Sequence, residues 1–103
     1  MGSASQANEA AELGPASVLV RSPGAIAEHV LEETVVVDAE LERYVRLNVT
    51  GRWVWERLAA PQALSELAAG LAAQFGISEA QALADVDAFA CELLARGLVE
   101  LAA

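Results

Sequence analysis

The chain changes its hydrophobic pattern once, in the stretch LNVTGRWVWERL at residues 47–58. The sequence before it is rich in Val and Thr, and the sequence after it is rich in Ala and Leu, which favours strands followed by helices. Asn48 and Thr50 suit the start of a helix, because a short polar side chain can accept a hydrogen bond from a first-turn backbone N–H. Three large apolar residues then share one helical face: Val54, Trp55 and Leu58. The stretch therefore predicts a strand-to-helix junction.

Residues 17–47 have the composition of extended chain. The strand candidates are Ser17–Arg21, Ala25–Leu31, Thr34–Val37 and Arg43–Leu47. The last of them alternates, so that Val45 and Leu47 face one side while Tyr44 and Arg46 face the other. We expect a small antiparallel sheet with three main strands.

Three helices are expected after the junction. The first covers residues 48–60 and the second about residues 63–75, with Gly76 as its C-terminal cap. The third begins after Ser78, which forms a capping box with Gln81, and it is closed by Gly97. The predicted fold class is α+β: a three-stranded antiparallel sheet followed by three helices, similar in shape to a winged helix-turn-helix domain.

The length of 103 residues allows one domain with a single modest core. Residues 1–15 are small and polar and are expected to form a disordered tail, which leaves residues 16–103 as the domain. No basic segment precedes an apolar run at the N-terminus, and no charge-free apolar run reaches the ~18 residues of a membrane span. We expect a cytoplasmic protein without a membrane partner.

The charge is strongly negative. Six basic residues stand against 15 acidic ones, which gives a net charge of −9. Such a surface repels phosphate backbones and anionic lipids, and the third predicted helix is itself acidic. Its charged residues are Glu79, Asp85, Asp87, Glu92 and Arg96. We therefore expect no nucleic-acid partner.

No group of residues has the spacing of a catalytic or metal site. Cys91 and His29 lie in distant segments, so they form neither a nucleophile–base pair nor a metal-ligand motif. Asp85 and Asp87 are two residues apart on a helix and therefore point in different directions. We expect no enzymatic activity, no cofactor and no metal.

Two features could bind a partner. Arg43–Leu47, if it is an edge strand, could pair its backbone with an added peptide strand; alternatively, its arginines only protect the edge. Trp53 lies beside residues that already fill the core face. It is expected to be partly buried between helices, or else to contact a partner or a second copy. A monomer or a weak homodimer fits both features.

Several short motifs occur in a fixed order. They are Val20-Arg21-Ser22-Pro23-Gly24, Leu47-Asn48-x-Thr50-Gly51, Val54-Trp55-x-x-Leu58, Leu64-x-x-Leu67 with Leu71, Phe75-Gly76-Ile77, Ala84-Asp85-Val86-x-x-Phe89 with Leu93, and Gly97-Leu98-Val99-Glu100. In this order and spacing the chain resembles the PqqD-like family, the leader-peptide-binding proteins also called RiPP recognition elements. The resemblance covers about residues 17–101.

This resemblance implies a non-catalytic peptide chaperone in natural product biosynthesis. It would bind the leader of a ribosomally made precursor peptide by strand addition and present it to a modifying enzyme. The partner would be a radical SAM protein or a leader peptidase, in a PQQ, lasso-peptide or radical-enzyme pathway. The third strand and the third helix would form the site, with these residues: Arg43, Tyr44, Val45, Arg46, Leu47, Asp85, Ala88, Phe89 and Glu92.

Two other functions fit the predicted elements. One is a winged helix-turn-helix transcription regulator, which the acidic third helix disfavours. The other is a structural subunit of a larger enzyme with no peptide of its own.

Overall fold

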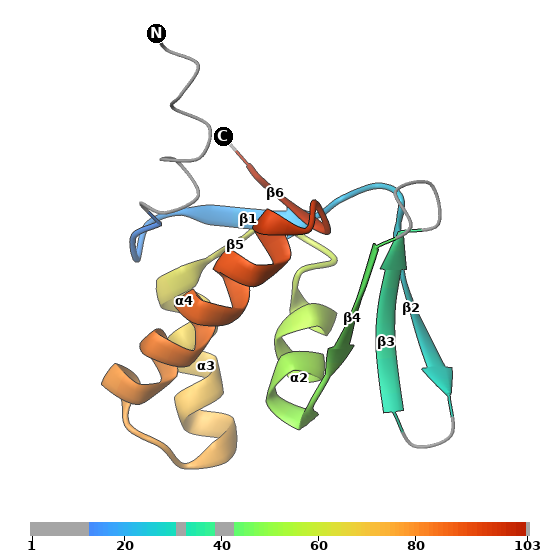
Figure 1. Ribbon diagram of the computed structural model, residues 1–103. Coiled ribbons are helices and arrows are strands. Elements are labelled where there is room, and N and C mark those ends of the chain that lie inside the picture. Colours follow the sequence, from blue (N-terminus) through green and yellow to red (C-terminus); the bar gives the residue numbers. More distant parts are fainter. Residues whose placement is uncertain (1–12, 31–32, 39–42, 103) are drawn as a thin grey trace, which may run out of the picture.

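The computed structural model describes residues 13–30, 33–38 and 43–102 (Figure 1). The strands are β1 (Val18–Arg21), β2 (Ala25–Val30), β3 (Glu33–Asp38), β4 (Arg43–Leu47), β5 (Gln62–Ala63) and β6 (Val99–Leu101). The helices are α2 (Val49–Arg57), α3 (Leu64–Phe75) and α4 (Glu79–Ala95). The fold is α+β, as the sequence predicted.

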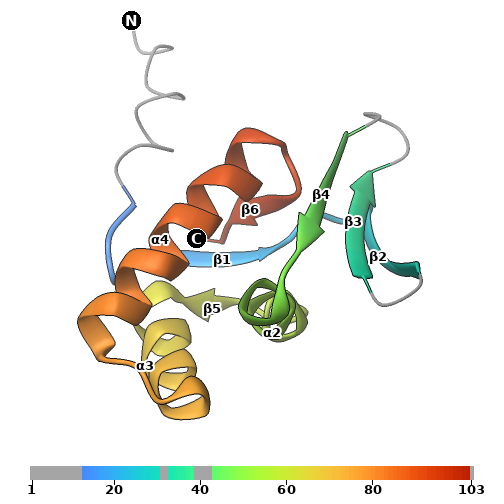
Figure 2. The same ribbon diagram turned by 60° about the horizontal axis from the view of Figure 1, so that its bottom comes forward.

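The strands form two separate antiparallel sheets. One has the order β2-β3-β4 and the other the order β5-β1-β6. The three helices lie below the second sheet in Figure 1, and the first sheet stands beside α2. The turned view in Figure 2 shows β4 between β3 and the helical half of the molecule.

The expected order of one sheet followed by three helices is only partly met: β2-β3-β4 is a three-stranded antiparallel sheet before the helices, but the second sheet was not expected. β5 lies between two helices and β6 follows the last one, and both pair with β1. A two-residue strand such as Gln62–Ala63 has no hydrophobic period to detect, and pairings so distant in sequence leave no local signal. The predicted similarity to a winged helix-turn-helix domain is not confirmed and remains a comparison of overall shape.

The helix boundaries follow the predicted caps closely. The Asn48 side chain accepts from the Gly51 N–H and the Ser78 side chain accepts from the Gln81 N–H, as expected. Gly76 caps α3 with a φ of 68°, in the left-handed region that favours glycine. Gln81 does not reach back to complete the capping box; its side-chain amide donates to Asp85 Oδ1 instead, at 2.8 Å. α2 ends at Arg57, earlier than predicted.

The core lies between the helices and the inner faces of both sheets. Its largest fully buried side chains are Trp55, Leu19, Leu58, Leu64, Leu67, Leu71, Leu93 and Leu98. Trp53 is only partly buried, and its ring meets Phe75 of α3 edge-on at 6.5 Å between centroids, while Arg57 lies over it at 3.8 Å. The predicted position of Trp53 between helices is confirmed.

The start of the described chain packs onto the domain. Leu13 contacts the core, and the Pro15 carbonyl accepts from the Ser65 N–H at 2.8 Å. Residues 1–12 of the predicted tail lie outside the described residues. Within the described residues no helix is long and apolar enough to cross a membrane.

Arg21 fastens strand β1 to the C-terminal end of helix α2. Its Nε and Nη2 donate to the Trp55 carbonyl at 3.0 and 2.7 Å, and its guanidinium lies 4.8 Å from the centre of the Trp55 ring. The Arg21 N–H also donates to the Leu58 carbonyl at 3.0 Å. Burial lowers the pKa of Arg21, with Glu56 acting in the opposite direction. The side chain thus satisfies a carbonyl at the end of α2 and fixes β1 against it.

We predict that Arg21→Lys lowers the free energy of unfolding by about 1–2 kcal/mol, because an ammonium cannot reproduce the two-pronged bond or the planar stacking. Urea denaturation followed by circular dichroism measures it. Arg52→Lys, on the exposed face of α2, is the matched control and should change stability little. Equal effects of the two changes would contradict this account.

Candidate functional site

β4 is an edge strand. It pairs with β3 in the register Thr34↔Leu47 to Asp38↔Arg43, and it ends the order β2-β3-β4. Val45 and Leu47 are buried at 7% and 8% exposure, whereas Tyr44 is 62% exposed and Arg46 is exposed. The predicted alternation is confirmed.

The bond from Arg96 shows which backbone groups point away from β3. Arg96 Nη1 donates to the Tyr44 carbonyl at 3.4 Å, so this carbonyl faces the C-terminal part of α4. The N–H and C=O of one strand residue point to the same side, and alternate residues repeat that direction. Tyr44 and Arg46 therefore present their backbone groups to the free edge, and Arg43, Val45 and Leu47 pair with β3.

One face of α4 lies opposite this edge. Ala88 and Phe89 are adjacent, and each lies three or four residues from both Asp85 and Glu92, which places the four on one side of a helix. The neighbouring side of α4 is anchored in the core by Ala82, Val86, Ala90 and Leu93. The helix is therefore held by its apolar stripe and offers a mixed polar and aromatic face.

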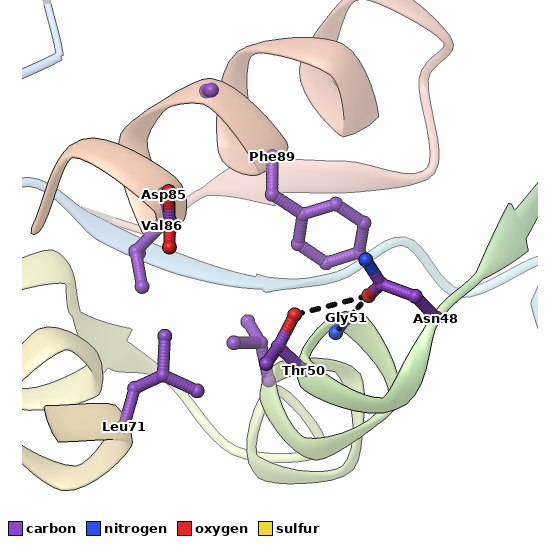
Figure 3. A pocket seen from close by; sticks show the side chains of 9 residues that line it. Asn48, Thr50, Gly51, Leu71, Asp85, Val86 and Phe89 are labelled. Atoms are coloured by element: carbon purple, nitrogen blue, oxygen red, sulfur yellow. Dashed lines mark hydrogen bonds between the residues drawn. The ribbon is translucent and has the colours of Figure 1, made fainter. Parts of the chain in front are cut away.

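A first cavity of about 280 Å³ lies between α2, α3 and α4. It is lined by Asn48, Thr50, Gly51, Val54, Leu71, Asp85, Val86, Ala88 and Phe89. Figure 3 shows Asp85 and Phe89 on α4 opposite Thr50 and Asn48 at the start of α2, with Leu71 of α3 at the other end. Polar and apolar groups share its wall about equally, and the polar side-chain atoms lie at Asn48, Thr50 and Asp85.

A second cavity of about 500 Å³ continues along β4. It is lined by Glu33, Arg46, Leu47, Asn48, Phe89 and Glu92. Asn48 and Phe89 line both cavities, so the two form one depression between β4, the start of α2 and α4. We call this depression the β4–α4 groove, defined by the residues of both cavities.

The turn at Asn48 shapes the groove. Asn48 Oδ1 accepts from the Gly51 N–H at 2.7 Å and from Thr50 Oγ1 at 3.0 Å, which caps α2 directly after β4. A Cβ on Gly51 would lie 3.1 Å from Asn48 Oδ1 and 3.4 Å from the Phe89 ring. Glycine therefore lets the first turn of α2 approach the Phe89 ring closely.

Ion pairs hold most of the charges around the groove. Arg46 Nε lies 3.7 Å from Glu33 Oε1, and Arg96 Nη2 lies 3.3 Å from Glu92 Oε2. Both pairs are well exposed, so each contributes little to stability.

The structure offers no activated nucleophile at Cys91. Burial, and secondarily the charge of Asp87, raises the pKa of its thiol, which leaves less reactive thiolate at neutral pH. Among the described residues no group of three or more His, Cys, Asp or Glu side chains could hold a metal ion.

The model of the family described as coenzyme PQQ synthesis protein D (PqqD) matches residues 33–99. The chain belongs to the PqqD family. The matched segment runs from β3 to the start of β6 and so includes the whole β4–α4 groove. No curated protein sequence matches the chain.

Three solved structures share the fold of this PqqD-family chain. TbiB1 in complex with the TbiA(β) leader peptide has a TM-score of 0.71 and 20% identity, over 82% of this chain and 98% of that one. Lasso peptide synthetase B1 complexed with the leader peptide has a TM-score of 0.69 and 20% identity, over 80% and 96%. The solution structure of the PqqD truncation of Methylobacterium extorquens PqqCD, a functional and stand-alone RiPP recognition element, has a TM-score of 0.75 and 17% identity, over 89% and 98%.

The residues expected to form the site lie in three places. Six line the groove: Arg46, Leu47, Asp85, Ala88, Phe89 and Glu92. The Val45 side chain is buried in the core. The Tyr44 side chain is exposed and lies outside both cavities; Tyr44 pairs with Val37 of β3, which pairs with Ile26 of β2. Arg43 begins β4. Tyr44 can therefore serve the groove through its backbone.

Sequence reasoning missed part of the groove. The additional lining residues are Glu33, Asn48, Thr50, Gly51, Val54, Leu71 and Val86. Asn48, Thr50 and Gly51 belong to a motif of this PqqD-family chain, but Asn48 and Thr50 were predicted only to start a helix and Gly51 was given no role. The useful signal was the glycine in the first helical turn, which indicates that another element approaches there.

We predict that Asn48→Ala lowers the free energy of unfolding by about 1 kcal/mol, because the Gly51 N–H and the Thr50 hydroxyl both lose their acceptor. Urea denaturation measures this loss of stability. Asn48→Asp replaces the amide oxygen with a carboxylate oxygen that accepts the same bonds, so this variant should be nearly as stable as the original chain. An alanine variant as stable as the original chain would show that the cap does not hold the junction.

Proposed function

We propose that this chain binds the leader segment of a ribosomally synthesised precursor peptide in the β4–α4 groove. The observation that carries the proposal is an edge strand whose free backbone groups face a groove formed with α4. Membership of the PqqD family supports it, as do the two similar structures that are complexes with leader peptides.

The leader would add as a strand beside β4. Tyr44 and Arg46 offer two N–H and two C=O groups to the edge, and Arg96 occupies only the Tyr44 carbonyl among the described residues. Backbone pairing supplies affinity for any extended peptide, and contacts between its side chains and the groove supply specificity. Arg43, Val45 and Leu47 would support the pairing by holding β4 on β3.

The chain would act without catalysis of its own. Its role would be to hold the leader while the adjoining core segment reaches a modifying enzyme, such as a radical SAM protein or a leader peptidase. The described residues offer a groove with mixed polar and apolar walls, and the single cysteine has a raised pKa. The strongly acidic α4 gives no support to the alternative of a DNA-binding regulator, because it would be repelled by a phosphate backbone.

We predict that Arg46→Pro weakens leader binding at least about 10-fold, because proline removes an N–H that points to the free edge. The fold should survive, since proline is tolerated on an edge strand where the N–H faces solvent. Isothermal titration calorimetry with the leader half of the precursor peptide encoded beside the gene measures the change.

Arg46→Ala is the matched control for this experiment. It removes the same guanidinium and its ion pair with Glu33 but keeps the backbone N–H. It should therefore bind the leader much more tightly than Arg46→Pro does. Equal affinities of the two variants, both folded by circular dichroism, would exclude strand addition at this edge.

A further inference from the structure

The three carboxylates that line the β4–α4 groove differ in their surroundings. Glu33 faces Arg46 and Glu92 faces Arg96, so both already have a cationic partner. Asp85 has no ion pair among the described residues, and its partner is the neutral side-chain amide of Gln81 at 2.8 Å. That bond engages Oδ1 and orients the carboxylate while leaving Oδ2 available.

The first cavity has a single formal charge. Asp85 is the only ionisable side chain among its nine lining residues, and the others are apolar or neutral. Val54, Leu71, Val86 and Phe89 provide the apolar wall, and Asp85 is exposed at the mouth (Figure 3). A cavity with these apolar side chains in its wall and one carboxylate at its mouth complements a long aliphatic stem that ends in a cation.

Four of the chain's basic side chains have partners outside the first cavity. The sequence contains six basic residues, all arginines. Arg21 bonds to the Trp55 carbonyl, Arg57 lies over Trp53, and Arg46 and Arg96 form the two ion pairs. No arginine lines the first cavity among the residues whose side chains the structure describes. The bound peptide would then supply the positive charge for Asp85.

We propose that Asp85 selects leaders that place a lysine or arginine side chain in the first cavity. The proposal rests on the proposed function, because the leader is the molecule that brings this side chain. The stem would pack along Val86 and Phe89, and the cationic head would meet Asp85 Oδ2. Thr50 Oγ1, which lines the same cavity and donates to Asn48 Oδ1, still has lone pairs that can accept a second bond (Figure 3).

The test combines changes in the leader with changes in the protein. Each lysine or arginine of the encoded leader is replaced in turn by norleucine, which keeps an aliphatic stem and removes the charge. Affinities for the original chain and for Asp85→Asn are measured by calorimetry; asparagine keeps an oxygen acceptor for Gln81. At one leader position the neutral residue should weaken binding to the original chain about 3- to 10-fold. The same replacement should have little further effect on Asp85→Asn.

Asp87→Asn is the matched control, because it removes the same charge from the same helix but lies outside both cavities of the groove. It should leave the preference for the cationic residue intact. Asp85→Lys should bind the original leader more weakly and recover when that position carries glutamate.

The outcomes separate this inference from the proposed function. In one outcome the leader binds tightly while neither the norleucine replacements nor the Asp85 variants change its affinity. That result would overturn the inference but not leader binding, and the cavity would then hold a neutral side chain. Absence of leader binding to the original chain would overturn both. Equal effects of Asp85→Asn and Asp87→Asn would show general charge attraction and would also overturn the role given to Asp85.

Discussion

The direct passage from β4 into α2 at Asn48 is the constraint on which the rest of the structure depends. One side-chain oxygen accepts from the Gly51 N–H and the Thr50 hydroxyl, so the strand becomes a helix with no intervening loop. The edge of β4 and the first turn of α2 therefore share one rigid corner. Phe89 packs against that corner at Gly51, which places the polar face of α4 opposite the strand edge.

The groove offers two kinds of groups for recognising a peptide, backbone groups and side chains. The edge of β4 offers backbone groups, which pair with any extended peptide regardless of sequence. The cavities offer side chains, and their chemistry is set by a few residues on α4 and α2. Because Glu33 and Glu92 are paired with arginines and Asp85 is not, Asp85 is the one carboxylate among the described groove residues where an added cation gains a partner. Net charge alone could not have identified that position.

Local signals in the sequence predicted much of the fold and part of the groove. The alternation of residues 43–47, the caps at Asn48 and Ser78 and the periodic helices all depend on neighbouring residues, and the structure agrees with them. β5 and β6 were missed, because their pairing with β1 depends on segments far apart in the sequence. The Gln81 side chain was assigned to the cap, yet it bonds to Asp85 on the next turn. Leu71 and Val54 were assigned to the core and also line the first cavity, which periodicity cannot distinguish.

The most direct measurement is an amide NMR titration of the isotope-labelled chain with the leader half of its precursor peptide. The account predicts saturable shifts in β4, the first turn of α2 and the groove face of α4, with slowed hydrogen exchange at the Tyr44 and Arg46 amides. The amides of β1, β5 and β6 should move little. Saturable shifts confined to that second sheet, or none at high peptide excess, would contradict leader binding at the β4–α4 groove.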